Sequence, residues 1–219
     1  MASAGGARDF GGLSDSWYFN HPNSFDPQNI SFSYCAWVRP VDPASTTSVI
    51  HGISGSTYSF CYNKPEWYSN IGNQINSGIT KTAEWWFFCM TYRESDNNVR
   101  FYLDVAANQV TLRATVAGSN SASATGVYHI GVYGGISFPW SGYAGQISYF
   151  DRELSLSEIQ ELQFNPSSIT DSNLQGNYPL WGVDNPELDV SGKGRNTTST
   201  VGTPGIADTS PPVFLLGGQ

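Results

Sequence analysis

Alternating apolar and aromatic positions dominate the first two thirds of the chain, with the two-residue period of β-strands. The clearest runs are residues 31–38 (SFSYCAWV) and 84–93 (EWWFFCMTYR). Both runs carry large apolar side chains on each of their two faces, so we expect inner strands that are covered on both sides. Together with the polar turn at 94–98, the second run and residues 99–105 predict a β-hairpin.

Shorter alternating runs predict further strands, which are separated by glycine-rich and polar turns. They lie at residues 48–53, 57–63, 109–116, 127–132 and 146–149. Residues 134–145 are rich in glycine, and we expect them to form a loop.

One helix is predicted within residues 151–165 (DRELSLSEIQELQFN). Ser155 and Glu158 have the spacing of a capping box, in which each side chain bonds to the backbone of the other residue. An apolar stripe at helical spacing follows, formed by Leu156, Ile159 and Leu162. Pro166 ends the pattern.

The pattern predicts a single domain over residues 1–219 with its core at about 8–165. From residue 166 onward the chain becomes turn-rich. We expect residues 166–219 to form a C-terminal extension that adds one strand, near 177–181, and an extended tail.

Composition supports an all-β domain and excludes several functions. Charged residues make up 13% and aromatic residues 14% of the 219 residues, with 23 glycines. A disordered chain would be richer in charge and a helical bundle richer in alanine and lysine. The net charge of -8, without a cluster of basic residues, argues against binding to nucleic acid or to an anionic membrane.

Targeting signals and cysteines point to synthesis in a reducing cytoplasm. Residues 1–12 lack the basic and apolar regions of a signal peptide, and no stretch approaches 18 apolar residues. Cys35, Cys61 and Cys89 have no metal-binding spacing, so we expect three buried, reduced thiols.

Four segments of the chain are specific in combination and in order. They are residues 32–40 (FSYCAWVRP), 85–92 (WWFFCMTY), 99–104 (VRFYLD) and 145–162 (GQISYFDRELSLSEIQEL). With these segments the chain resembles, over residues 8–165, the laminin-G-like domains of the concanavalin A-like jelly-roll type. The resemblance implies an all-β jelly-roll sandwich with one short helix near residues 155–164.

The C-terminal extension resembles a narrower group within that family. Residues 178–182 (YPLWG) and 189–194 (DVSGKG) are similar to a segment that many members carry at the start of the domain. Its position here indicates a circular permutation, which sandwich domains with neighbouring termini tolerate. With the PPVF sequence at 211–214, this arrangement resembles laminin-G-like structural proteins encoded by tailed bacteriophages.

Catalysis is not expected from the pattern of carboxylates. Glycosidases with this fold use two nearby carboxylates on one strand. No alternating strand of this chain carries such a pair, so we predict no catalytic residues and no enzymatic activity, whether as a glycoside hydrolase or as a lyase.

Aromatic residues in the predicted loops are the candidate contact residues. They are Trp67, Tyr68, Phe138, Trp140 and Tyr143. Such side chains either stack on sugars, contact a protein partner, or fold over the edge of the sandwich.

Three acidic residues are weak candidates for a calcium site, although we expect no cofactor or metal. They are Asp184, Glu187 and Asp189, which lie in a turn-rich segment. The alternative is a turn network in which these side chains bond to their own backbone.

The sequence thus predicts a non-enzymatic bacteriophage virion protein, an outer capsid decoration protein that coats or stabilises the head. Its partners would be the major capsid protein or other virion proteins, and it would form a homo-oligomer such as a trimer. It would lie on the virion surface after synthesis in the host cytoplasm. The alternative is a lectin-like adhesin that binds host surface glycans.

Overall fold

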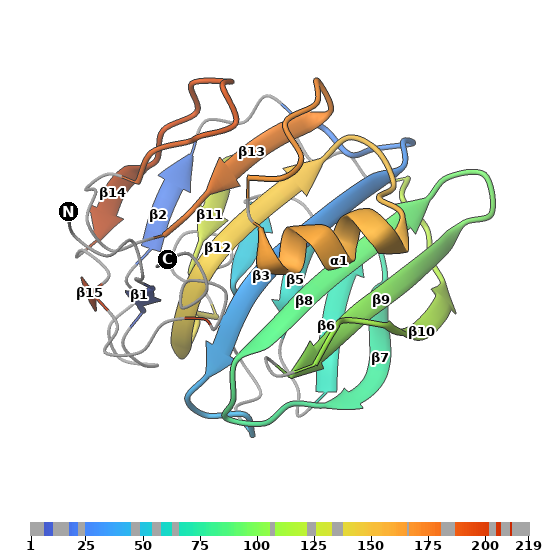
Figure 1. Ribbon diagram of the computed structural model, residues 1–219, viewed down its shortest axis with the longest axis horizontal. Helices are drawn as coiled ribbons and strands as arrows, with labels where there is room; N and C mark the ends of the chain where they lie inside the picture. The colour runs from blue at the N-terminus through green and yellow to red at the C-terminus, as the bar shows by residue number, and fades with distance from the viewer. Residues whose placement is uncertain are drawn as a thin grey trace.

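The computed structural model describes residues 7–10, 18–21, 25–44, 49–53, 58–62, 66–105, 108–121, 126–132, 138–165, 167–180, 187–201, 205–206 and 211. Two antiparallel β-sheets pack face to face, and one helix lies outside them (Figure 1). The predicted all-β sandwich with one short helix is confirmed. None of the helices in these ranges is both long and apolar enough to span a membrane.

Among the described residues, sheet A has eight strands and sheet B has seven. The order in sheet A is β10 (Leu112–Ala117), β9 (Asn98–Val105), β8 (Trp86–Arg93), β3 (Phe32–Pro40), β12 (Gly142–Phe150), β1 (Arg8–Asp9) and β15 (Gly205–Ile206), and β13 (Leu174–Tyr178) also pairs with β12. The order in sheet B is β14 (Thr198–Val201), β2 (Tyr18–His21), β11 (Tyr128–Ile130), β4 (His51–Ile53), β5 (Tyr58–Tyr62), β6 (Glu66–Ile71) and β7 (Gln74–Thr80).

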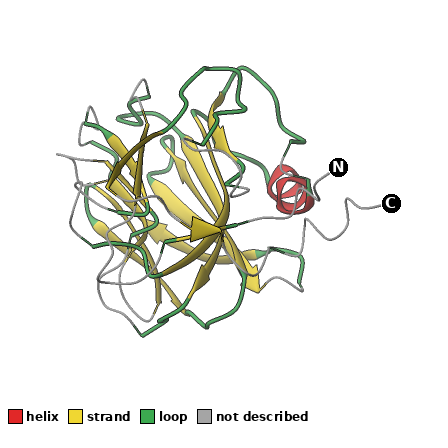
Figure 2. Ribbon diagram, turned by 90° about the vertical axis from the view of Figure 1, so that its left-hand side faces the viewer, coloured by secondary structure: helices red, strands yellow, loops and turns green. Residues whose placement is uncertain are grey.

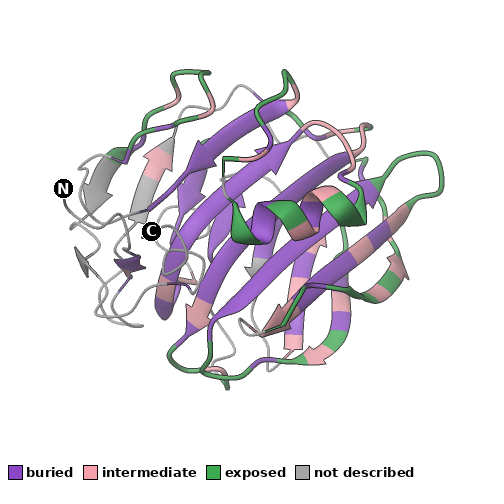
Figure 3. Ribbon diagram, in the orientation of Figure 1, coloured by how far each residue is buried: buried purple, intermediate pink, exposed green. Residues whose placement is uncertain are grey.

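The two long aromatic runs form the centre of sheet A, as the sequence predicts. β3 and β8 pair along their length, with Cys35 opposite Cys89 and Trp37 opposite Phe87. Both strands are buried almost throughout (Figure 3). Cys35 and Cys89 are free, buried thiols as expected, whereas the Cys61 side chain lies outside the described part of the structure.

Two separate clusters of apolar side chains explain why both faces of these strands are buried. Residues such as Tyr34, Phe88 and Phe101 point into the core between the sheets. Trp37 and Phe87 point the other way, into a second cluster beneath the helix α1 (Leu156–Phe164). The molecule is therefore built from three layers, which are sheet B, sheet A and α1 (Figure 2).

Specific hydrogen bonds hold α1 on sheet A. The predicted capping box of Ser155 and Glu158 is present. Trp37 Nε1 on β3 donates to the Gln163 carbonyl at 3.0 Å. The buried Gln163 side chain accepts from the Val110 amide at 2.8 Å and donates to the Asn108 carbonyl at 2.8 Å. The helix end thus supplies partners for loop backbone groups that would otherwise be buried without them.

Several strands were not predicted from the sequence. β6 lies where we expected Trp67 and Tyr68 to be in a loop, no element was predicted at β7, and β12 begins at Gly142 rather than at residue 146. The C-terminal extension supplies three strands instead of one, because β14 joins sheet B and β13 and β15 join sheet A. The strand expected at 177–181 is β13, which ends at Tyr178.

The N-terminal and C-terminal parts of the chain meet at one edge of sheet A. β1 pairs with β12 on one side and with β15 on the other. Next to this pairing, Arg8 Nε donates to Glu187 Oε1 at 2.5 Å, and the two side chains are only 4% and 2% exposed. This buried ion pair ties the first described strand to the C-terminal extension.

We predict that Gly142→Ala destabilises the protein by about 3 kcal/mol, because the added methyl group has no space. Gly142 has a φ of 151°, and a Cβ there would lie 2.2 Å from the Arg39 carbonyl oxygen. Urea unfolding followed by tryptophan fluorescence measures the loss. Gly78→Ala is the control, since its φ of 71° strains alanine by only about 1 kcal/mol and nothing lies within 4 Å. Equal losses of unfolding free energy in the two variants would contradict the explanation that the added methyl group at residue 142 lacks space.

Removing one member of the buried ion pair should also destabilise the fold. We expect Arg8→Met to cost about 3–5 kcal/mol of unfolding free energy, because Glu187 would remain buried without its cation. The double variant Arg8→Met/Glu187→Met should recover a large part of that loss. Arg113→Met is the control, because its pair with Asp104 is more exposed and should cost under about 1 kcal/mol. The interpretation fails if the single and double variants are equally unstable.

A third prediction concerns stability in acid. Hydrogen bonds from Arg152, and then from Ser155, lower the pKa of Glu158 to about 2 against the opposing effect of burial. Because the folded pKa lies below the unfolded value, Glu158 stabilises the fold above pH 4.5, and this contribution is lost as the pH falls toward 2. The difference in unfolding free energy between wild type and Glu158→Gln should therefore shrink over that interval. A difference that stays constant down to pH 2 would refute this.

Candidate functional site

Two of the five predicted contact residues have no exposed surface. Trp67 and Trp140 are 0% exposed, and both belong to the core between the sheets. Trp67 lies in β6, where its ring centroid is 5.6 Å from that of Trp86. The predicted loop position of Trp67 is therefore wrong, because alternate residues of β6 face the core. Neither indole can stack on a ligand in this conformation.

The other three aromatic residues are half-buried and do not form one surface. Tyr68 follows Trp67 in β6 and faces away from the core, on the outer face of sheet B. Tyr143 lies in β12, not in the predicted loop, and packs against the cluster on the outer face of sheet A. Phe138 has a φ of 57°, a region that bulky side chains rarely adopt. Tyr68 and Tyr143 thus lie on opposite faces of the sandwich.

Tyr143 has two neighbours on the outer face of sheet A. The Arg39 guanidinium lies 5.5 Å from the centroid of the Tyr143 ring, and the Trp85 ring lies 6.3 Å from it. This arrangement of two aromatic rings and a cation is typical of contact surfaces. Of the predicted aromatic residues, Tyr143 has the surroundings that best fit contact with a partner.

The predicted calcium candidates have other partners. Asp184 lies outside the described residues, and the Glu187 carboxylate is bound by Arg8. The Asp189 carboxylate accepts hydrogen bonds from the amides of Asn177, Ser191 and Arg195 and from the Ser191 hydroxyl. Four donors around one carboxylate form the turn network that we gave as the alternative. In the described ranges, no group of three or more His, Cys, Asp or Glu could hold a metal ion.

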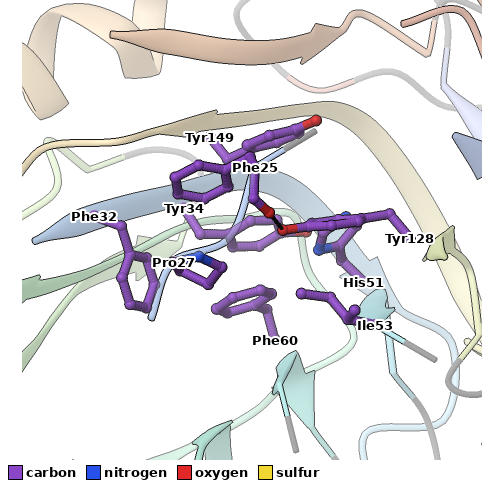
Figure 4. Close-up of a pocket in the computed structure, with 9 residues that line it drawn as sticks. All are labelled: Phe25, Pro27, Phe32, Tyr34, His51, Ile53, Phe60, Tyr128 and Tyr149. Carbon is purple, nitrogen blue, oxygen red and sulfur yellow. Dashed lines mark hydrogen bonds between the residues drawn. The ribbon is translucent and has the colours of Figure 1, made fainter. Parts of the chain in front are cut away.

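The described residues leave little space at the cavity between the sheets. A cavity of about 10 Å³ lies there among aromatic side chains that point toward one another (Figure 4). It is lined by Phe25, Pro27, Phe32, Tyr34, His51, Ile53, Phe60, Tyr128 and Tyr149. This volume is about that of one water molecule, so the cavity is a packing defect of the core.

The buried Cys89 thiol is a poor nucleophile. Burial, followed by a hydrogen bond with Cys35, raises the pKa of the Cys89 thiol well above its usual value. The thiol therefore stays protonated at neutral pH, whereas a reactive cysteine requires the thiolate.

A surface hollow of about 310 Å³ was not predicted from the sequence. It lies where the β8–β9 hairpin meets the beginning of α1, and we call it the α1 hollow. Its lining includes Arg93, Tyr102, Glu153, Ser155, Leu156 and Glu158. Periodicity places Tyr102 away from the inter-sheet core, on the side of β9 opposite Phe101 and Leu103, but no sequence signal brings residues 153–158 beside it.

Comparisons with known proteins agree with this architecture. A solved structure from Bacteroides ovatus, to which a carbohydrate-binding function is ascribed, matches with a TM-score of 0.67 at 15% identity. The match covers 92% of this chain but only 58% of that protein, so this chain spans less than two thirds of its length. A heptameric, SAP-like pentraxin from Limulus polyphemus matches with a TM-score of 0.57 at 14% identity, covering 92% of this chain and 97% of the pentraxin.

No curated protein sequence matches the chain. The family model for the concanavalin A-like lectin/glucanases superfamily matches residues 10–160, which is more than half of the chain. The two packed antiparallel sheets and the single helix are the architecture that the sequence resemblance implied. The chain therefore belongs to the concanavalin A-like lectin/glucanases superfamily.

Proposed function

We propose that this chain is a non-enzymatic structural protein of the bacteriophage virion, attached to the outside of the capsid. The observation that carries the proposal is the way the C-terminal extension is built into the sandwich. It contains the segments that resemble phage laminin-G-like proteins, and its strands complete both sheets. Through β1 and β15, the described parts of both chain ends lie at one edge of sheet A.

Other properties support attachment rather than catalysis. On the outer face of sheet A, Glu153, Glu158 and Asp171 are each paired with an arginine, which suits a stable surface better than acid–base chemistry. The net charge of -8 favours solubility at the high concentration that capsid coating requires. The partners would be the major capsid protein or other virion proteins. A homo-oligomer such as a trimer would match the local symmetry of a capsid.

Analysis of purified particles tests this proposal. We expect the chain in density-gradient-purified virions at a fixed molar ratio to the major capsid protein, measured by quantitative mass spectrometry. Adding the purified protein to particles that lack it should raise their thermal stability, because a ligand that binds only the assembled shell stabilises it. An unrelated acidic protein of similar size is the control. Absence from purified virions would refute the proposal.

The second candidate function is recognition of host glycans, and two observations favour it. The structurally similar Bacteroides ovatus protein has a carbohydrate-binding function ascribed to it. The outer face of sheet A carries the α1 hollow, which has a volume in the range of small-molecule sites. A protein on the virion surface could serve both functions, because attachment and recognition would use different faces.

A further inference from the structure

A tyrosine in the α1 hollow has a hydroxyl group that the protein itself does not use. Tyr102 lines the hollow and is only 7% exposed. Its ring packs in the cluster beneath α1. Its hydroxyl makes no hydrogen bond within the described part of the chain. The hydroxyl is not one of the fully buried polar atoms, so solvent reaches it and it is available to a ligand in the hollow.

Tyr102 lines the hollow together with Arg93 and Glu153, and its hydroxyl is a hydrogen-bond donor. Burial, and then the Glu153 carboxylate, raise the pKa of this phenol, while Arg100 and Arg93 act in the opposite direction. The hydroxyl therefore lies near these three side chains, and it keeps its proton at neutral pH. A ligand in the hollow would meet a neutral donor rather than a phenolate.

The charges around the hollow cancel in pairs. Arg93 Nε donates to Glu153 Oε2 at 2.5 Å, and Arg100 Nη1 lies 3.5 Å from Glu153 Oε1. Arg152 Nη2 lies 2.7 Å from Glu158 Oε1, which also completes the helix cap. Each guanidinium already has a carboxylate, so an anionic ligand would gain little. Each carboxylate has a guanidinium, so the same holds for a cation.

Hydrogen-bonding capacity nevertheless remains on these pairs. Arg93 uses only Nε for a hydrogen bond in the described chain, since its Nη1 lies 3.6 Å from Asp96 Oδ2. Among the described residues, Glu153 Oε2 accepts a hydrogen bond from Arg93, whereas Oε1 has only the ion-pair contact with Arg100. The hollow therefore presents Tyr102 and Arg93 as donors beside Glu153 as an acceptor. A ligand whose hydroxyl groups both donate and accept would satisfy all three.

An apolar side chain forms one side of the hollow. Leu156 is the first residue of α1 and is 40% exposed, which is high for a leucine. The volume of about 310 Å³ lies at the lower end of the range for small-molecule sites. The hollow thus combines hydroxyl-binding groups with one apolar contact, in a space for a single small ring.

We propose that the α1 hollow binds one neutral sugar ring, such as the uncharged pyranose at the end of a glycan. Tyr102, Arg93 and Glu153 would bond to neighbouring sugar hydroxyls, and Leu156 would contact the C–H face of the ring. This assignment rests on the glycan-recognition function, to which it adds a location and a ligand class. It does not depend on attachment to the capsid.

A glycan array followed by titration tests the site. The full chain is screened against arrays that present neutral hexoses, N-acetylhexosamines and sialic acids, and the strongest neutral binder is titrated as its methyl glycoside by NMR. We expect binding to neutral sugars and a loss of roughly three- to tenfold in affinity for Tyr102→Phe, which removes one hydrogen bond. Tyr92→Phe is the matched control on the same hairpin, because its hydroxyl bonds to Asn97. This control should bind like the wild type.

A second pair of variants distinguishes a loss of ligand binding from a loss of folding. Leu156 and Phe164 lie at opposite ends of α1 and are 40% and 41% exposed. Leu156→Ser should weaken binding by a similar factor, whereas Phe164→Ser should not. If neutral sugars bind and neither Tyr102→Phe nor Leu156→Ser weakens them, the site is wrong although glycan recognition stands. If no neutral sugar binds, or only sialylated glycans do, the proposal is overturned.

Discussion

Sheet A must be covered on both of its faces, and the other features of the fold follow from this constraint. β3 and β8 carry large side chains on each side, with Tyr34 and Phe88 on one and Trp37 and Phe87 on the other. A single sheet-on-sheet contact can bury only one set. The second set requires another layer, which α1 supplies together with the segments that flank it.

The hydrogen bonds that anchor the start of α1 determine which side chains meet on the outer face of sheet A. The Ser33 hydroxyl on β3 donates to the Arg152 carbonyl and accepts from the Leu154 amide, so the chain before the helix is fixed to the centre of sheet A. Residues 152–158 consequently lie beside the β8–β9 hairpin. The Glu153 carboxylate pairs there with Arg93 and Arg100 of the hairpin, and the space left between the two segments is the α1 hollow.

The C-terminal extension, which carries the segments that resemble phage proteins, is also built into the fold. Its strands lie in both sheets, and Glu187 bonds to Arg8 at the other end of the described chain. The strands nearest the two ends of the described chain are thus held by pairing and by a buried ion pair. The same closure engages the Glu187 and Asp189 carboxylates in hydrogen bonds within the fold.

The sequence by itself determined the all-β class, the inner position of β3 and β8, their hairpin with β9, and the capped helix. These features depend on a period of two along a strand, or on pairs three or four residues apart, so a short window of sequence contains them. The sequence pattern did not predict β6, because the turn residues near Pro65 suggested a loop. In the structure, Trp67 and Ile71 of β6 are buried between less buried residues.

Only the tertiary structure decided which aromatic side chains are exposed and which polar groups meet. Trp67 and Trp140 are equally buried, although the sequence predicted both in loops. Their side chains lie in the core between the two sheets. Arg93 and Glu153 are 60 residues apart in sequence, and Arg8 and Glu187 are 179 apart. Contacts at such separations depend on how the layers pack, and no local pattern encodes them. The surroundings of Tyr102 likewise form only when α1 lies on sheet A, because Arg93 and Arg100 belong to its own sheet and Glu153 to the segment before the helix.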